Sequence, residues 1–214
     1  MKICVVGAGN IGLALTSVLA LQKKHDVVLY TKKEFNPSEL VFKDIEAGTE
    51  YEHLEFSVET DLETALKNAD YIFCTYPAFL RKDFIEKAVP YISAGSKIGF
   101  VPGYGGAEYM CNSLVDKDVT IFGLQRVPFV ARQENQKLAT ILSRKEQLFA
   151  AAIPKGQTSV VCNDLESLIG IPTVALKEYM AVTLTPSNPL LHLTGLYNVF
   201  KDYKEGDYYD RQLM

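Results

Sequence analysis

The stretch KICVVGAGNIG (residues 2–12) decides the fold of this 214-residue chain. It begins with an apolar run rich in β-branched residues, as in a buried parallel strand. Gly7, Gly9 and Gly12 follow with the spacing G-x-G-x-x-G. In such a turn the first glycine permits the bend, the second lets the backbone approach a diphosphate, and the third lets the next helix pack on the strand. The stretch predicts a dinucleotide-binding turn, and the alternative is a domain whose glycines serve packing alone.

Strands and helices alternate along the chain after this turn. Predicted strands cover residues 2–7, 26–31, 54–58, 70–77 and 96–103, and predicted helices cover 11–22, 61–69, 79–89 and 107–114. Four closely spaced strand-like runs follow at 119–124, 128–132, 138–142 and 148–154, a spacing typical of an antiparallel or mixed edge. The alternation predicts an α/β domain of the Rossmann type with a doubly wound, mainly parallel sheet.

The pattern changes near residue 176. A helix at 159–169, stopped by Gly170, and a strand at 172–176 end the alternation, and the pattern is helical from 177 onward. We predict a dinucleotide-binding domain over 1–176 and the start of an all-helical substrate domain over 177–214. Because a few dozen helical residues enclose little core, we expect them to pack on the first domain, on another subunit or on further residues. A homodimer is a candidate assembly.

Composition narrows the class of protein. The hydrophobic fraction of 48% and charged fraction of 22% are ordinary for a globular protein, and the net charge of −4 argues against nucleic acid as a partner. Residues 3–21 carry no charge, but the three glycines explain this run better than a membrane span does. The four cysteines are scattered without a CxxC pair. We therefore expect a reduced, cytoplasmic protein with no metal site and no membrane association.

The end of the second strand bears on the choice of cofactor. NAD sites usually place an acid about 20 residues after the glycines, to bind the ribose 2′-hydroxyl. Here Thr31, Lys32 and Lys33 stand at that point. A hydroxyl and two cations suit a 2′-phosphate better, so NADP is preferred over NAD. The alternative is that both lysines simply face water.

Further candidates follow the other predicted strands, because ligands bind outside the carboxyl ends of parallel strands. Thr75, Tyr76 and Pro77 stand at the end of the fourth strand, and the glycine-rich residues 102–106 stand at the end of the fifth. Gln125 and Arg126 end a later strand. An arginine there suits a substrate carboxylate, since its planar guanidinium binds bidentately, although a surface salt bridge explains it as well.

A histidine near the end of the chain is the candidate acid or base. In SNPLLHLTG (residues 187–195), Ser187 or Asn188 can cap a helix whose first turn holds Pro189. His192 then lies within about a turn of the positive helix end, which disfavours the imidazolium form, so it can exchange a proton near neutral pH. Gly195, on the same face, would leave space beside the ring. The alternative is a core histidine among leucines.

The ordered set GAGNIG, TYPAF, VPGYGGAEYM, LQRVPFVAR and SNPLLHLTGLYN resembles the opine dehydrogenases, the octopine and nopaline dehydrogenase group, over the whole chain. That resemblance implies a Rossmann domain followed by a helical domain. It also implies condensation of an amino acid with a 2-oxo acid, and reduction of the imine by NADH or NADPH. The resemblance further implies that Gly7, Gly9 and Gly12 bind the cofactor and that His192 acts as the acid/base. The family's helical domain is longer and supplies an acidic partner for the histidine, so this chain resembles a truncated member.

We therefore predict an NAD(P)H-dependent oxidoreductase of the opine dehydrogenase type. The predicted cofactor residues are Gly7, Gly9, Asn10, Ile11, Gly12, Thr31, Lys32, Lys33, Thr75 and Pro77. The predicted substrate residues are Arg126 and Asn188. Alternatives are a reductase of the ketopantoate or glycerol-3-phosphate dehydrogenase type and a non-catalytic nucleotide-binding module.

Overall fold

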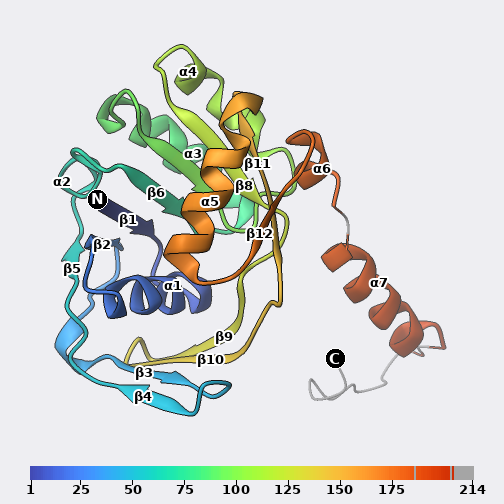
Figure 1. The fold of residues 1–214 in the computed structure, drawn as a ribbon. Helices are drawn as coiled ribbons and strands as arrows, with labels where there is room; N and C mark the ends of the chain where they lie inside the picture. Colours follow the sequence, from blue (N-terminus) through green and yellow to red (C-terminus); the bar gives the residue numbers. More distant parts are fainter. Residues whose placement is uncertain (186, 203, 205–214) are drawn as a thin grey trace.

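The computed structural model describes residues 1–185, 187–202 and 204, with backbone but not side chains given for residues 187–189, 191–192 and 198–199. Its centre is an eight-stranded sheet in the order β12-β11-β8-β7-β6-β1-β2-β5 (Figure 1). The strands are β1 Lys2–Val6, β2 Asp26–Tyr30, β5 Ser57–Glu59, β6 Tyr71–Cys74, β7 Lys97–Phe100, β8 Thr120–Leu124, β11 Leu148–Ile153 and β12 Thr173–Ala175. All neighbours pair in parallel except β8 and β11. The predicted doubly wound, mainly parallel sheet is confirmed.

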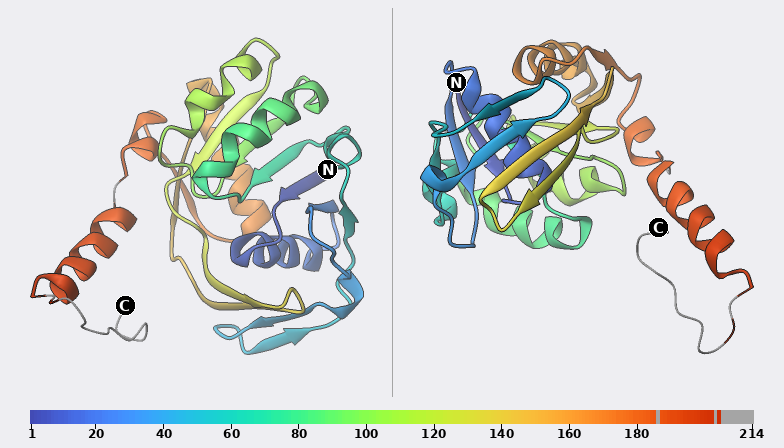
Figure 2. Two further views of the ribbon diagram at one scale, coloured as in Figure 1. Left: turned by 180° about the vertical axis from the view of Figure 1, so that it is seen from behind. Right: turned by 90° about the horizontal axis from the view of Figure 1, so that it is seen from below.

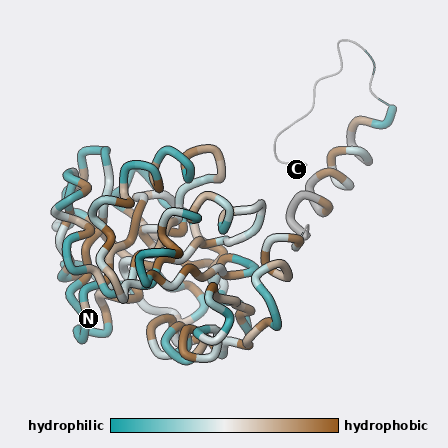
Figure 3. The backbone as a smooth tube through the Cα atoms, turned by 90° about the horizontal axis from the view of Figure 1, so that it is seen from above, coloured by the Kyte–Doolittle hydropathy of each residue, from teal (hydrophilic) through white to brown (hydrophobic). Residues whose placement is uncertain are grey.

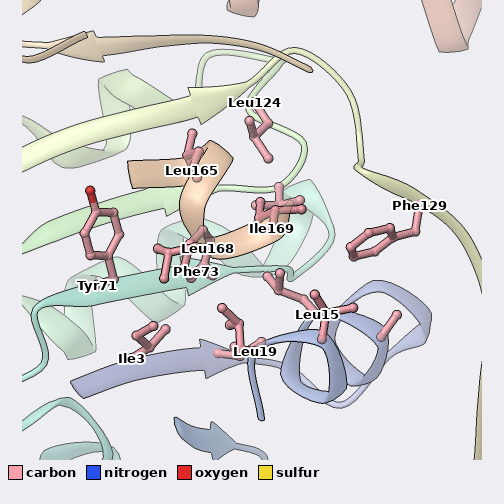
Figure 4. Close-up of a cluster of buried hydrophobic side chains, with 14 of the residues drawn as sticks. Ile3, Leu15, Leu19, Tyr71, Phe73, Leu124, Phe129, Leu165, Leu168 and Ile169 are labelled. Atoms are coloured by element: carbon pink, nitrogen blue, oxygen red, sulfur yellow. The ribbon is translucent and has the colours of Figure 1, made fainter. Parts of the chain in front are cut away.

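Helices cover both faces of this sheet, which explains why its central strands are apolar on both sides. On one face lie α1 (Asn10–Leu21) and α5 (Thr158–Ile169). Figure 4 shows Leu15, Leu19, Leu165 and Leu168 from these helices packed over Phe73 of the sheet. The other face is covered by α2 (Leu62–Leu66), α3 (Ala78–Ala88), α4 (Asn112–Val115) and the 3-10 helices η2 (Val89–Tyr91) and η3 (Ala107–Cys111).

A second, four-stranded sheet lies across the outer side of α1 (Figure 2). Its order is β4-β3-β10-β9, with β4 Thr49–Tyr51, β3 Val41–Asp44, β10 Leu138–Arg144 and β9 Phe129–Glu134. Phe42, Phe129 and Ile141 are fully buried, in the same apolar cluster as Leu15. This sheet explains why α1 is buried on every side from Gly12 to Ala20.

The predicted mixed edge is confirmed only in part. β8 and β11 form an antiparallel pair at the edge of the main sheet, as expected. The two runs between them leave that sheet, and β10 instead pairs with β9 and, in parallel, with β3. The physical reason is the apolar outer face of α1, which these strands cover. Neither β3 nor β4 was predicted, and the remaining 3-10 helices are η1 (Pro37–Glu39) and η4 (Lys155–Gln157).

The short helix α6 (Met180–Thr183) packs on the first domain. Tyr179 and Val182 are buried in the cluster formed by the α3 side of the sheet. A Cβ at Gly123 would lie 2.5 Å from the Tyr179 hydroxyl oxygen, so a glycine is required where α6 meets β8. Thr183 Oγ1 also donates to Glu108 Oε1 at 2.5 Å. The division predicted after residue 176 stays a prediction, and these contacts favour one after α6.

Helix α7 (Ser187–Phe200) stands apart from both sheets (Figure 1). Figure 3 shows apolar segments along it, and Leu193 and Tyr197 are 62% and 70% exposed. In the described part of the chain, no helix combines the length and the apolar character that crossing a bilayer requires.

Candidate dinucleotide site

The glycine turn has the geometry that an approaching diphosphate requires. Gly7 follows β1 with φ +105°, in the region that favours glycine, and its N–H donates to Tyr30 O at 2.9 Å. A Cβ on Gly12 would lie 1.7 Å from Gly7 O, so helix and strand approach too closely for any side chain there. Gly9 is exposed, and a Cβ on it would meet nothing within 4 Å. The first and third glycines thus serve packing, and the second borders open space.

The amino end of α1 is left available to an anion. Its cap residue is Gly9, which has no side chain to bond the first-turn N–H groups, and the first turn contains no acidic residue. Free N–H groups and the positive end of the helix dipole together favour a bound phosphate. Gly7, Gly9 and Gly12, all predicted cofactor residues, therefore form one cradle at the amino end of α1.

Asn10 and Ile11 support the cradle. Asn10 is exposed, and its Oδ1 accepts a 3.0 Å hydrogen bond from Gln133 N in β9. This bond ties the start of α1 to the four-stranded sheet. Ile11 is half-buried and packs against the cluster that contains α1 and α5. Cofactor contact by either residue remains a prediction.

The residues after β2 divide into one buried hydroxyl and two exposed cations. Thr31 is buried, and its Oγ1 accepts from Lys33 N at 3.1 Å, so this hydroxyl shapes the turn. Lys32 and Lys33 are exposed. Lys32 also lines a cavity of about 120 Å³ between the ends of β2 and β6, whose other lining residues are Tyr30, Leu62, Tyr76, Leu80, Asp83, Phe84 and Lys87.

This cavity has an aromatic wall that includes Tyr76, a residue expected at this edge, and a second cation, Lys87, that sequence reasoning missed. Burial raises the pKa of Tyr76 from an ordinary 10.0 to about 12, because the ring is partly withdrawn from water. Lys87 comes from α3, where it pairs with Asp83 at 2.6 Å. In the sequence it reads as part of an ordinary charged helix face, and only the fold brings it beside Lys32.

Thr75 and Pro77 lie at the end of β6, beside the turn. Thr75 Oγ1 donates to Val6 O at 2.8 Å, and it would lie 3.0 Å from a Cβ on Gly7. Thr75 therefore holds the end of β6 against the end of β1. Pro77 is exposed and caps α3 without a side-chain hydrogen bond. Both stand at the carboxyl edge, as expected, and their cofactor contacts stay predictions.

Arg81 is a positioning residue that the sequence reading did not identify. Its side chain is 3% exposed and donates to three carbonyls: Nε to Tyr76 O at 3.0 Å, Nη1 to Tyr104 O at 3.2 Å and Nη2 to Pro102 O at 2.8 Å. No acid within the described residues forms an ion pair with it. Arg81 thereby joins the loop after β6 to the loop after β7.

The glycine-rich loop at 102–106 has less free backbone than expected. Gly103 N donates to Leu124 O at 2.7 Å, and Gly105 N donates to Thr183 O at 3.3 Å. Gly105 and Gly106 both have positive φ, at +83° and +77°. These glycines therefore allow a turn that receives α6, and two of the loop's amides are already bonded within the chain.

Gln125 and Arg126 follow β8 at the same edge of the sheet. They line a cavity of about 200 Å³ together with Lys145 and Gln147, and with Leu148 and Phe149. The structure thus places Arg126 at the carboxyl edge of the sheet, the edge that also carries the glycine turn. Substrate contact by Arg126 stays a prediction.

Asn188 and His192 are not brought to this edge by the described structure. Both belong to α7, which stands apart from the sheet in Figure 1, and their side chains lie outside the described residues. Their assigned roles in substrate binding and proton transfer therefore remain predictions.

The order of the strands defines the class of protein. Strand order reverses at β1, with β2 and β5 on one side and β6, β7 and β8 on the other. Ligands of doubly wound sheets bind at this switch point, and here it coincides with the glycine turn. Sheet, turn and uncapped helix end together define a dinucleotide-binding domain of the Rossmann type.

The chain belongs to the ketopantoate reductase PanE/ApbA family, whose model matches residues 3–141. It is also similar to the octopine dehydrogenase of Mizuhopecten yessoensis, at 26% identity over 216 residues covering 92% of this chain and 54% of that protein. The chain thus spans about half the length of that relative.

Solved structures show the same fold. An octopine dehydrogenase with NADH and L-arginine matches 98% of this chain and 57% of its own, with a TM-score of 0.80 at 22% identity. A yersinopine dehydrogenase with bound NADP⁺ matches 83% of this chain and 48% of its own, with a TM-score of 0.65 at 13% identity. Reductases and dehydrogenases that use either form of the nicotinamide cofactor therefore share this architecture.

Proposed function

We propose that this protein is an NAD(P)H-dependent oxidoreductase of the opine dehydrogenase type, which condenses an amino acid with a 2-oxo acid and reduces the imine. The observation that carries the proposal is the cradle of Gly7, Gly9 and Gly12. In this cradle α1 packs closely on the end of β1, and the space beside Gly9 is open. The amino end of α1 at this point has no side-chain cap. The likeness to octopine dehydrogenase, which extends to 92% of the chain, supports the choice of reaction.

We propose NADPH as the preferred cofactor. Lys32 lines the cavity at the end of β2, and Lys33, the next residue, is exposed. Lys87 also lines this cavity and is paired with Asp83. Cations at this place favour a ribose 2′-phosphate. Because the lysines are solvent-exposed, we expect Lys32→Glu to weaken NADPH binding by roughly tenfold, or about 1.4 kcal/mol, and to leave NADH binding nearly unchanged.

The amine nitrogen attacks the carbonyl carbon of the 2-oxo acid, water leaves, and a C=N bond forms. When bound, the reduced nicotinamide supplies the hydride that, with one proton, converts this C=N bond to the C–N bond of a secondary amine. Arg126 and Asn188 would hold a substrate carboxylate, and His192 would protonate the departing oxygen as water leaves. Arg81 would keep the loops at Tyr76 and Tyr104 in place around the reacting groups.

Turnover of NADPH with pyruvate and an amino acid tests the proposal. We expect His192→Ala to abolish turnover and to leave NADPH affinity nearly intact, because the glycine turn lies in another element. Thr194→Ala, which removes an exposed hydroxyl from the same helix, serves as the control. Unchanged turnover in His192→Ala would refute the role of the histidine.

The family match favours one alternative, a reductase of the ketopantoate type. Turnover with ketopantoate and no amino acid would support it, and turnover with dihydroxyacetone phosphate would support the glycerol-3-phosphate dehydrogenase type. The separation of α7 from the sheet favours the non-catalytic nucleotide-binding module. A non-catalytic nucleotide-binding module should bind NADPH tightly and turn over none of these substrates.

A further inference from the structure

The cavity beside Arg126 is built from two connections that are far apart in the sequence. One is residues 125–128, between β8 and β9, and the other is residues 145–147, between β10 and β11. Because β11 runs antiparallel to β8, the start of β11 lies at the carboxyl edge of the sheet. Gln125 N donates to Phe149 O at 2.8 Å, and Lys145 N donates to Pro128 O at 2.9 Å. The two connections are thus held together at the carboxyl edge of the sheet, the edge that also carries the glycine turn.

The lining of this cavity is cationic and lacks a neutralising acid. Arg126 and Lys145 supply two positive charges, Gln125 and Gln147 supply amides, and no carboxylate belongs to the lining. In the described part of the chain neither cation takes part in an ion pair. Two cations without a counter-ion in one cavity attract an anion.

Two acids at the end of β3 and in the turn after it are engaged by a different arginine. Arg144 donates through its guanidinium to Asp44, and its N–H donates to Glu46 Oε2 at 2.6 Å. Lys145 is the next residue along the chain. Asp44 and Glu46 are thus engaged by Arg144. Glu146, the next residue after Lys145, is exposed and does not line the cavity, and in the described part of the chain it forms no ion pair with Lys145.

The size of the cavity exceeds the need of one carboxylate. A volume of about 200 Å³ corresponds to roughly six or seven water molecules. Arg126 is exposed and Lys145 is half-buried, so a ligand can reach both charges, and Leu148 and Phe149 supply an apolar wall. A short carbon chain with an acid group at each end fits this combination of two cations and an apolar wall.

We propose that this cavity selects a dicarboxylic substrate, with Arg126 and Lys145 binding its two acid groups. The inference rests on the proposed function, because it assigns the substrate class of that reaction. The dicarboxylate is either the 2-oxo acid or an amino acid with an acidic side chain. Neither acid group changes its bonding in the reaction, so Arg126 and Lys145 determine specificity and take no part in bond making.

Calorimetric titration of the 214-residue chain with succinate, with and without NADPH, tests the site separately from turnover. We expect Arg126→Gln and Lys145→Gln each to weaken succinate binding by about tenfold, since each removes the charged donor of one carboxylate. NADPH affinity should not change in either variant. Lys155→Gln is the matched control, because Lys155 is exposed and follows the opposite end of β11. Propionate, with one acid group, should bind at least tenfold more weakly than succinate.

Absence of succinate binding, or equal weakening in all three variants, would overturn the inference. Absence of NADPH binding together with intact succinate binding would instead refute the proposed function and leave this site standing. Turnover then identifies the source of the second acid group. A preference for 2-oxoglutarate over pyruvate assigns it to the oxo acid, and a preference for L-glutamate over L-alanine assigns it to the amino acid. If neither dicarboxylate is preferred, the inference is wrong.

Discussion

Replacement of Gly9 by alanine should separate cofactor binding from folding. Gly9 has φ −90° and ψ −172°, which alanine adopts readily, and its added Cβ would meet nothing within 4 Å. Alanine caps a helix less well than glycine, but it lowers the entropy of the unfolded chain by about 0.4–1 kcal/mol. These effects nearly cancel, so we expect the melting temperature without ligand to change by less than about 3 °C.

The effect on binding should be much larger. The new methyl group would occupy the space through which the backbone reaches the diphosphate. At a concentration of 100 Kd, a ligand stabilises the native protein by about 2.7 kcal/mol, which corresponds to a rise of roughly 5–11 °C for a chain of this size. If Gly9→Ala weakens binding about 100-fold, the same NADPH concentration adds only about 0.4 kcal/mol, or roughly 1 °C.

Thermal denaturation with and without NADPH measures both effects in one assay. Gly156→Ala is the matched control, since Gly156 is also exposed, has no positive φ and would give its Cβ nothing within 4 Å. The control should keep the full rise in melting temperature. The same full rise in Gly9→Ala would refute the reasoning, because it would mean that the diphosphate does not approach this backbone.

Three further substitutions or conditions test the surroundings of the site. Gly12→Ala should destabilise the fold by about 3 kcal/mol or more, because its Cβ would stand 1.7 Å from Gly7 O. Urea titration measures the free energy of unfolding, and a decrease below about 1 kcal/mol contradicts the close contact. Arg81→Met removes the donor from three carbonyls. The loss of about 3 kcal/mol should lower the melting temperature by roughly 6–12 °C, and Arg81→Lys should regain part of that temperature. An unchanged melting curve contradicts the role of Arg81. Burial raises the pKa of Cys4 to about 12 and of Cys74 to about 11, from an ordinary 9.0. The stability that comes from keeping these thiols neutral is full below pH 9 and is lost as the pH rises toward 11–12. Urea titrations at about pH 7 to 11 measure this loss, and a constant free energy of unfolding across that range would contradict it.

The local features of the fold could be predicted because the sequence contains their cause. The β1–turn–α1 unit spans only residues 2–21, and the contact between Gly12 and Gly7 is set by that short segment. The end of α5 was equally predictable from the sequence, since a glycine is favoured at a left-handed C-cap and Gly170 has φ +74° there. Such features depend on neighbours along the chain.

The second sheet depends on neighbours that are distant along the chain. β3 pairs with β10 about 100 residues later, with Phe42 opposite Ala139. The run VFKD is too short and too polar to identify as a strand by itself. Its place becomes clear only when α1 is seen to need a cover on its outer face.

The candidate site was predictable in position more than in detail. The carboxyl-edge rule locates Thr75 and Arg126, but it does not show that Asn10 Oδ1 and the Thr31 hydroxyl bond within the chain. The burial of Arg81 could have been predicted from its spacing, because it shares a helix face with the apolar residues Phe84, Ile85 and Ala88. An arginine at the first position of an apolar stripe indicates a buried cation.

Hydrogen–deuterium exchange of the 214-residue chain with and without NADPH tests the central claim most directly. If the glycine turn holds the diphosphate, NADPH should slow amide exchange in residues 7–13, at the start of α1, and in residues 31–33 after β2. Exchange in α4, on the far side of the sheet, should stay the same. Binding that leaves residues 7–13 unprotected, or no binding of either NADPH or NADH, would contradict the account.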